Sequence, residues 1–125
     1  MMTGLQKEEI QSDRTTIARR FAADWGHVVV LKGAFTIVAS PDGRATINPF
    51  ATSALAGAGT GDVLAGLITG FIAQGMEPYE AAVSGSYVHG MAGDLAAEVM
   101  GTESGVLARD VLNLIPQALA ATTRC

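Results

Sequence analysis

The most informative segment is Ala58-Gly59-Thr60-Gly61-Asp62-Val63-Leu64-Ala65-Gly66, in which a glycine loop leads directly into a helix. The first N–H groups of a helix have no partner within the helix, and the helix dipole favours negative charge there. Because Gly59 and Gly61 lack side chains, a phosphate can approach those N–H groups closely. No Lys-Ser or Lys-Thr pair follows the glycines, so the segment is not a Walker loop. The segment therefore predicts an anion hole of another kind.

Asp62 stands at the start of this helix, and two roles are open to it. Aspartate is a favoured N-cap residue, whose carboxylate accepts hydrogen bonds from backbone N–H groups. The alternative role is a general base that faces the substrate. A negative charge beside a bound phosphate is unfavourable, and from the spacing alone the N-cap interpretation is preferred.

The chain ahead of this segment is predicted to form a helix and then three strands. A helix over residues 6–25 is indicated by apolar side chains at helical spacing, and Gly26 ends it. Its apolar side, with Trp25, is expected in the core, and Arg14, Arg19 and Arg20 on the solvated side. The apolar side chains are Ile10, Ile17, Phe21 and Trp25.

The β-branched run over residues 27–31 predicts a strand that is buried on both faces. Residues 35–40 and 44–48 are predicted as two further strands. The turn Pro41-Asp42-Gly43 joins them, so they form a hairpin.

Three helices are predicted after the glycine loop, over residues 62–74, 78–100 and 106–120. Pro78 suits the first turn of the second of these helices. Gly66 and Gly70 lie four residues apart on the first helix, where each costs about 1 kcal/mol relative to alanine. We therefore expect a neighbouring element to pack closely against these two glycines.

This order of elements is typical of an α/β sheet protein, although three strands cannot build a doubly wound sheet alone. The chain of 125 residues is one domain at most. Hydrophobic residues make up 49% of it, which excludes intrinsic disorder. Charged residues are 16%, below the roughly 25% of an average soluble domain. We therefore expect the C-terminal portion of a larger fold, with an open sheet edge or face and a homo-oligomeric state.

Composition also excludes several classes of function. The net charge of −4 leaves no basic surface for nucleic acid. The single cysteine, Cys125, excludes a disulfide scaffold and a cysteine-based zinc site. No segment is typical of a membrane span or of a secretion signal, so a cytoplasmic location is expected.

Several motifs, in this order, resemble the ADP- or ATP-dependent NAD(P)H-hydrate dehydratases of the ribokinase-like superfamily. The resemblance covers nearly the whole chain. The motifs are Val30-Leu31-Lys32-Gly33-Ala34-Phe35-Thr36, Pro41-Asp42-Gly43-Arg44, Asn48-Pro49, the glycine segment, His89-Gly90-Met91-Ala92-Gly93-Asp94 and Ala108-Arg109-Asp110-Val111. It departs from many members at Asn48-Pro49-Phe50-Ala51-Thr52, where these have Asn-Pro-Thr-Gly-Asn.

The resemblance implies an α/β fold, with residues 1–125 as the C-terminal part of a ribokinase-like domain: three strands, two of them a hairpin, and about four helices. It implies a lyase that repairs the (S)-hydrate of NADH or NADPH, with ADP or ATP as co-substrate and Mg²⁺ expected. Family domains are roughly twice as long, so most of the hydrate pocket is missing. The isolated chain is therefore expected to be inactive.

The resemblance also assigns roles to residues. Asp62 becomes the substrate contact and the catalytic base, in preference to the N-cap. No residue is assigned to a metal. The nucleotide contacts would be Lys32, Gly33, Ala34, Phe35, Thr36, Gly59, Thr60 and Gly61.

Other interpretations stay open. Lys32 is alternatively a solvated strand end. His89 is better explained as a core histidine with one satisfied hydrogen bond, and Asp94 as a surface or interface charge. The alternative functions are a ribokinase-like kinase for a small vitamin precursor and a truncated chain that binds nucleotide without turnover.

Overall fold

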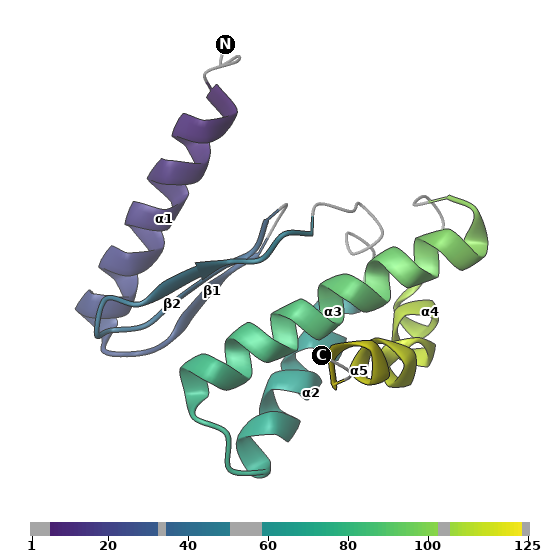
Figure 1. The fold of residues 1–125 in the computed structure, drawn as a ribbon. Helices are drawn as coiled ribbons and strands as arrows, with labels where there is room; N and C mark the ends of the chain where they lie inside the picture. The colour runs from purple at the N-terminus through teal and green to yellow at the C-terminus, as the bar shows by residue number, and fades with distance from the viewer. Residues whose placement is uncertain (1–5, 33–34, 51–58, 103–105, 124–125) are drawn as a thin grey trace.

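The computed structural model describes residues 6–32, 35–50, 59–102 and 106–123, and Figure 1 shows them as one small sheet between helices. Gly33 and Ala34, two of the predicted nucleotide contacts, lie outside these ranges, as do Ala51 and Thr52. The elements are α1 (Gln6–Trp25), β1 (Val29–Leu31), β2 (Ile37–Ala39), β3 (Ala45–Ile47), α2 (Thr60–Ala73), α3 (Pro78–Met100), α4 (Ala108–Asn113) and α5 (Ile115–Thr123).

The three strands form an antiparallel sheet in the order β1-β2-β3. Val38 of the central strand pairs with Val30 on one side and with Thr46 on the other. Gly43 closes the turn of the hairpin with a left-handed φ of 99°, a conformation that glycine adopts without strain. The predicted α/β class and the predicted hairpin are both confirmed.

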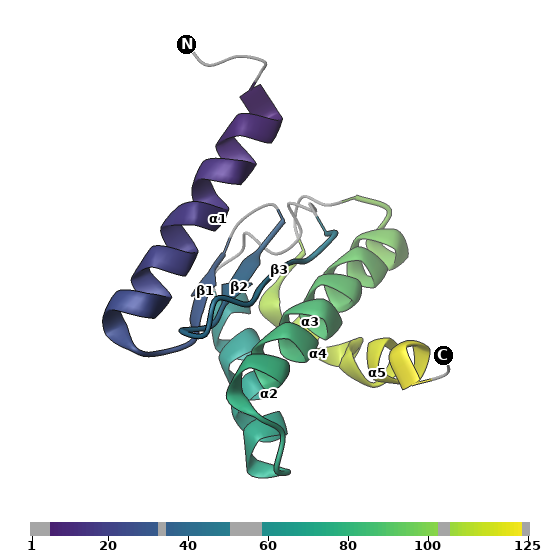
Figure 2. The same ribbon diagram turned by 60° about the vertical axis from the view of Figure 1, so that its left-hand side comes forward.

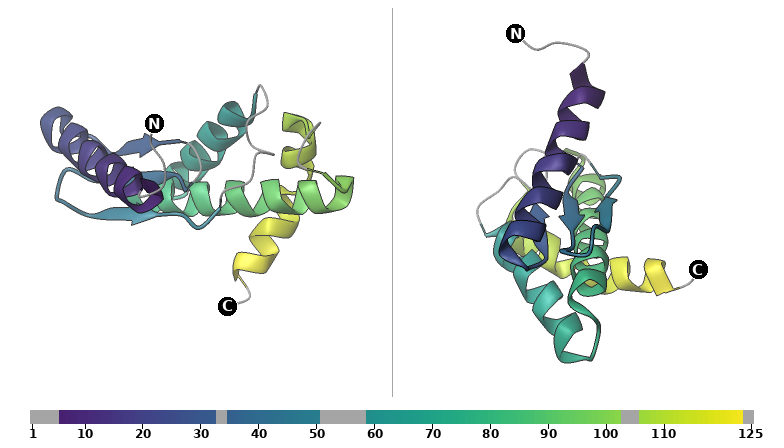
Figure 3. Two further views of the ribbon diagram at one scale, coloured as in Figure 1. Left: turned by 90° about the horizontal axis from the view of Figure 1, so that it is seen from above. Right: turned by 90° about the vertical axis from the view of Figure 1, so that its left-hand side faces the viewer.

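Helices cover the two faces of β2, as Figures 2 and 3 show from different sides. Successive side chains of a strand point to opposite faces. Ile37 and Ala39 meet α1, whereas Val38 meets Tyr79 and Ala82 of α3. Burial on both faces was predicted for residues 27–31, and this prediction is wrong. The doubly covered strand is β2, and β1 is half-buried because it has one neighbouring strand in the described part of the chain.

The apolar side of α1 differs from the prediction. Small side chains face the sheet, since Ala18 and Ala22 are fully buried there. Phe21 and Trp25 stack on each other with their ring centroids 4.8 Å apart, and Trp25 is 60% exposed. The expectation that Trp25 lies in the core is therefore wrong. Alanine lets the helix axis approach the narrow sheet, and the larger side chains then point to a side where no described segment packs.

The second half of the chain is a group of helices built around α3. A core cluster joins this helix to α4 and α5, with the apolar side of α2 packed against it. Gly85 of α3 lies against α2, where a Cβ atom would come within 2.7 Å of the Ile68 side chain. Gly66 and Gly70 have no neighbour of this kind, so the predicted close packing occurs at Gly85 instead. The central residues of this core are Val88, Ala92, Ala96, Val106, Val111, Ile115 and Ala118.

The helix predicted over residues 106–120 divides into α4 and α5 at Leu114. Pro116 explains the break, since proline has no N–H and its ring clashes with the carbonyl four residues earlier. The described residues thus contain five helices rather than about four.

Candidate functional site

The glycine segment forms the N-terminus of α2, as predicted, but the helix begins two residues earlier than expected. The helix begins at Thr60, and Gly59 is its N-cap with a left-handed φ of 89°. The Gly59 carbonyl accepts hydrogen bonds from the N–H groups of Asp62 (3.1 Å) and Val63 (3.3 Å). A Cβ atom on residue 59 would lie 3.1 Å from the Ala108 Cβ atom. Both the backbone angle and this neighbour therefore require glycine at the turn.

Asp62 is the third residue of α2 and does not cap it. The N-cap position belongs to Gly59, and the helix has no side-chain cap. Within the described ranges, no hydrogen bond or ion pair engages the Asp62 carboxylate, and the residue is exposed. The N-cap interpretation is therefore wrong. The carboxylate remains available to a ligand.

Lys32 and Gly61, which belong to different motifs, come together in the structure. Lys32 directly follows β1, and its side chain extends to the start of α2. Its Nζ atom lies 2.5 Å from the place that a Cβ atom on residue 61 would occupy. Glycine leaves room for the ammonium group here, and a larger residue would require the end of the Lys32 side chain to move. The arrangement sets a positive charge beside the turn that was predicted to bind an anion.

Arg14 holds the backbone next to Lys32. Its Nη2 atom donates to the carbonyl oxygens of Leu31 (3.3 Å) and Lys32 (3.2 Å). The guanidinium thereby connects α1 to the end of β1. The expectation that Arg14 lies on the solvated side of its helix is wrong, because the residue is half-buried.

His89 approaches the same turn from α3. The side chain is 6% exposed, and its imidazole forms a hydrogen bond with the backbone of Thr60. Burial lowers the pKa of His89 below its ordinary value, and the nearby Lys32 charge lowers it further, while the bond to Thr60 opposes both. A bond that raises the pKa of a histidine is one that the ring donates, so the acceptor is the Thr60 carbonyl. The interpretation as a core histidine with one satisfied hydrogen bond is confirmed.

Within the described ranges, the second ring nitrogen of His89 has no partner. Nε2 is buried, and no described group forms a hydrogen bond with it. The other ring nitrogen donates to Thr60, so in the neutral ring Nε2 is the acceptor. In the same ranges, the amide nitrogen of the Asn48 side chain and the hydroxyl of Ser86 are also buried without a partner.

Phe35 and Thr36 belong to the predicted nucleotide contacts of residues 32–36, and the structure describes both of them. The Phe35 N–H donates to the Phe50 carbonyl (2.9 Å), and the Thr36 carbonyl accepts from the Asn48 N–H (2.9 Å). Phe35 has a φ of 57°, which is uncommon for a residue other than glycine. The Phe50 ring in turn covers Gly90, where a Cβ atom would overlap it. This segment is thus tied to α3 through Phe50.

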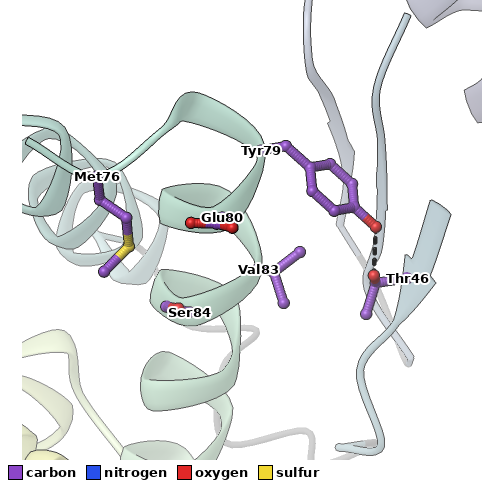
Figure 4. Close-up of a pocket in the computed structure, with 6 residues that line it drawn as sticks. All are labelled: Thr46, Met76, Tyr79, Glu80, Val83 and Ser84. Atoms are coloured by element: carbon purple, nitrogen blue, oxygen red, sulfur yellow. Dashed lines mark hydrogen bonds between the residues drawn. The ribbon is translucent and has the colours of Figure 1, made fainter. Parts of the chain in front are cut away.

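A pocket of about 220 Å³ lies elsewhere, where the hairpin meets the start of α3 (Figure 4). Tyr79 forms its wall with a hydrogen bond between its hydroxyl and that of Thr46. Arg44 lies over the Tyr79 ring and pairs with Asp42 and Glu77. The pocket contains none of the predicted site residues. Its lining is Thr46, Met76, Tyr79, Glu80, Val83 and Ser84.

Among the residues that the structure describes, no three side chains of His, Cys, Asp or Glu come together as metal ligands. In the same ranges, none of the helices has the length and apolar character needed to cross a membrane.

The sequence analysis named Arg14 and His89 but did not connect either of them with Lys32 or Gly61. Both act on backbone carbonyls, and such bonds leave no periodic pattern in a sequence. The available signal was the position of His89 among small residues of a buried helix, and nothing in the spacing links Arg14 to Lys32.

Known proteins resemble this chain over most of its length. The sequence profile described as NAD(P)H-hydrate dehydratase matches residues 1–117. The bifunctional NAD(P)H-hydrate repair enzyme of Moorella thermoacetica is 44% identical over 94% of this chain and 22% of its own length. The ADP-dependent (S)-NAD(P)H-hydrate dehydratase of Neisseria meningitidis is 42% identical over 88% of this chain and 37% of its own length.

A solved structure shows the same fold. It is the ADP/ATP-dependent NAD(P)H-hydrate dehydratase of Bacillus subtilis, co-crystallised with ATP and Mg²⁺ and soaked with CoA. It superposes with a TM-score of 0.82 and 34% sequence identity, over 95% of this chain and 44% of that protein. The chain thus spans less than half the length of the relatives that it matches.

Proposed function

The chain belongs to the NAD(P)H-hydrate dehydratase family, and on this basis we propose that it supplies the nucleotide side and the catalytic base of an ADP- or ATP-dependent dehydratase. The substrate would be the (S)-hydrate of NADH or NADPH, and the reaction would repair a damaged nicotinamide cofactor. The observation that carries the proposal is the contact between Lys32 and Gly61, with the exposed Asp62 as the next residue.

In this proposal the nucleotide lies along Lys32–Thr36 and the start of α2. The Lys32 ammonium and the backbone N–H groups of residues 59–61 meet the negative charge of the phosphates. Mg²⁺ would accompany the nucleotide, with ligands from the phosphates, since the described residues provide no ligand set of their own.

Asp62 takes the proton in this chemistry. The hydroxyl group of the hydrate attacks the terminal phosphorus of the nucleotide, and its proton passes to the Asp62 carboxylate. The bond from that phosphorus to the bridging oxygen breaks, and the shortened nucleotide leaves. The phosphorylated hydrate then loses phosphate with the electron pair of the C–O bond, and a proton leaves the neighbouring carbon to restore the double bond. The position of Asp62, exposed and not used as a cap, supports this role.

We also propose that residues 1–125 are the C-terminal portion of the domain and form a homo-oligomer in the cytoplasm. Exposed apolar side chains support the association, since Phe21 is 42% and Trp25 60% exposed on one side of α1. Light scattering tests it, and a monomer at high concentration would contradict it.

The function is tested by nucleotide binding and by turnover, measured separately. We expect calorimetry to show weak binding of ADP and ATP, and Lys32→Gln to weaken it by about tenfold or more, as for loss of a charged hydrogen bond. In an assay with NADH hydrate, the isolated chain is expected to restore no NADH absorbance, because positioning of both reactants carries much of the rate.

Asp62→Asn tests the base in a protein that contains the whole domain. Nucleotide affinity should stay nearly the same, and turnover should fall by about 10²–10⁴-fold. Asp24→Asn, an exposed residue on α1, is the matched control and should leave both unchanged. Unchanged turnover in Asp62→Asn would refute the catalytic role. A phosphorylated product without return of NADH would indicate a kinase instead.

A further inference from the structure

We propose that Arg14 and His89 are positioning residues that hold the contact between Lys32 and Gly61 from its two sides. Arg14 acts through the backbone of Lys32, and His89 acts through the backbone of Thr60, the residue before Gly61. The inference rests on the proposed function in one respect, that Lys32 and Gly61 meet the nucleotide. The geometry of the contact itself does not depend on that role.

On the first side, Arg14 fixes the direction in which Lys32 leaves the sheet. Its guanidinium donates to two successive carbonyl groups, 3.3 and 3.2 Å away, at the end of the half-buried strand β1. Both bonds come from the Nη2 atom, and two bonds to neighbouring peptide groups restrict the rotation of these groups. The Lys32 side chain is thereby aimed at the start of α2. Arg19 and Arg20 of the same helix are exposed and make no such bond.

On the second side, His89 fixes the first turn of α2. His89 lies on α3, which packs closely against α2 at Gly85 and Ile68. This packing fixes the position of the His89 ring relative to α2. Its N–H donates to the Thr60 carbonyl, which belongs to the peptide bond that leads into Gly61. The orientation of the Gly61 backbone, and with it the space for the Lys32 ammonium, is set by this bond.

Among the described residues, the buried Nε2 atom of His89 has no partner, and this supports a role beyond packing. A buried acceptor without a partner is unfavourable, and an apolar side chain at position 89 would avoid that cost. Histidine there supplies a donor to Thr60, while burial and the nearby Lys32 charge both lower the pKa of His89. These two effects oppose a second positive charge beside Lys32.

The two residues come from opposite faces of the sheet. α1 packs against β1 and β2, and α3 packs against the other face of β2 and against α2. The Lys32–Gly61 contact is thus a junction between the strand layer and the helical group, and each layer provides one support for it.

The experiment records the Gly61 amide signal by ¹⁵N NMR in the whole chain, together with calorimetry of ADP and ATP. We compare Arg14→Ala, Arg14→Lys and His89→Leu with Arg19→Ala as the matched control. Arg14→Ala and His89→Leu should each move the Gly61 signal and weaken nucleotide binding by about three- to tenfold, as for loss of one or two hydrogen bonds. Arg19→Ala should change neither. Arg14→Lys should restore part of both, because lysine can donate to one of the carbonyls.

A double variant separates positioning from a general effect on stability. If Arg14 acts through Lys32, then Arg14→Ala has no further effect on nucleotide affinity in the Lys32→Gln background. An effect of full size in that background overturns the proposal. So does an unmoved Gly61 signal in both Arg14→Ala and His89→Leu. If Arg14→Ala does not fold, Arg14→Lys replaces it. A smaller movement of the Gly61 signal in Arg14→Lys supports the proposal, and an unmoved signal overturns it.

Failure of the proposed function would be recognised separately. If neither ADP nor ATP binds to the unaltered chain, the nucleotide role of Lys32 is wrong. A Gly61 signal that moves in Arg14→Ala but not in Arg19→Ala still supports the positioning role under that outcome.

Discussion

The two long helices of this chain, α1 and α3, have similar lengths but very different surroundings. α3 has 23 residues, of which eleven are buried, and it packs against α2, α4, α5 and β2. α1 has 20 residues and packs on β1 and β2, and among its described side chains only Ala18 and Ala22 are buried. Both helices have an apolar side. The difference shows that periodicity predicts which side of a helix is apolar, whereas burial requires another segment to cover it.

The largest expected effect comes from adding one methyl group to the enclosed helix. In Gly90→Ala the new Cβ atom would overlap the Phe50 ring, and Phe50 is fixed at its backbone by the bond to Phe35. We expect a loss of about 1–3 kcal/mol in the free energy of unfolding, measured by urea denaturation. Gly70→Ala on α2, where nothing lies within 4 Å, is the control and should stabilise the chain by up to about 1 kcal/mol. Equal effects of the same sign would contradict the described packing.

Two substitutions on α1 compare its covered and uncovered sides. Ala22→Leu should cost about 1–3 kcal/mol, because a larger side chain has no room between α1 and β2. Trp25→Gln should change the free energy of unfolding by no more than about 0.5 kcal/mol, as is usual for an exposed position. It should also reduce self-association in light scattering. A large loss of stability in Trp25→Gln would mean that the tryptophan is covered in solution.

The smallest of these effects is a dependence of stability on pH, and it arises in the enclosed region. The folded state lowers the pKa of His89, mainly by burial, so the unfolded chain binds this proton more readily. The free energy of unfolding should therefore fall as the pH drops below about 6.5, the ordinary value for histidine, and continue to fall down to the lowered pKa of the folded state. His89→Gln should flatten this slope, and the exposed His27→Gln should not. Denaturation curves at a series of pH values would measure it, and an unchanged slope in His89→Gln would contradict the assignment.

Much of the fold could be predicted from the sequence. Gly26 and Pro78 mark helix boundaries that the structure confirms, since each restricts the backbone locally. The division of the last predicted helix into α4 and α5 could also have been predicted, because Pro116 cannot continue a helix that begins before it. The choice of Ala18 and Ala22 over Phe21 and Trp25 could not be predicted, because it depends on the distance between α1 and the sheet.

The site was predicted in its components and not in its arrangement. Lys32, Gly61 and Asp62 were singled out from motifs, and the structure brings the first two into contact. The N-cap interpretation of Asp62 failed because glycine at 59 adopts a backbone angle that starts the helix earlier. The supports at Arg14 and His89 depend on tertiary contacts between side chains and backbone carbonyls, which single-sequence patterns do not encode.

The contact between Gly59 and Ala108 determines the order in which parts of this site can fold during synthesis. As the chain leaves the ribosome, the strands of residues 29–47 meet their partners within a short stretch of sequence. The glycine turn must wait for residue 108, which at about 5–20 residues per second means a delay of roughly 2–10 seconds. The last helices to be synthesised thus complete a turn whose own residues emerged long before, and a nascent chain that stops before α4 carries a paired sheet beside a turn that lacks its contact with Ala108.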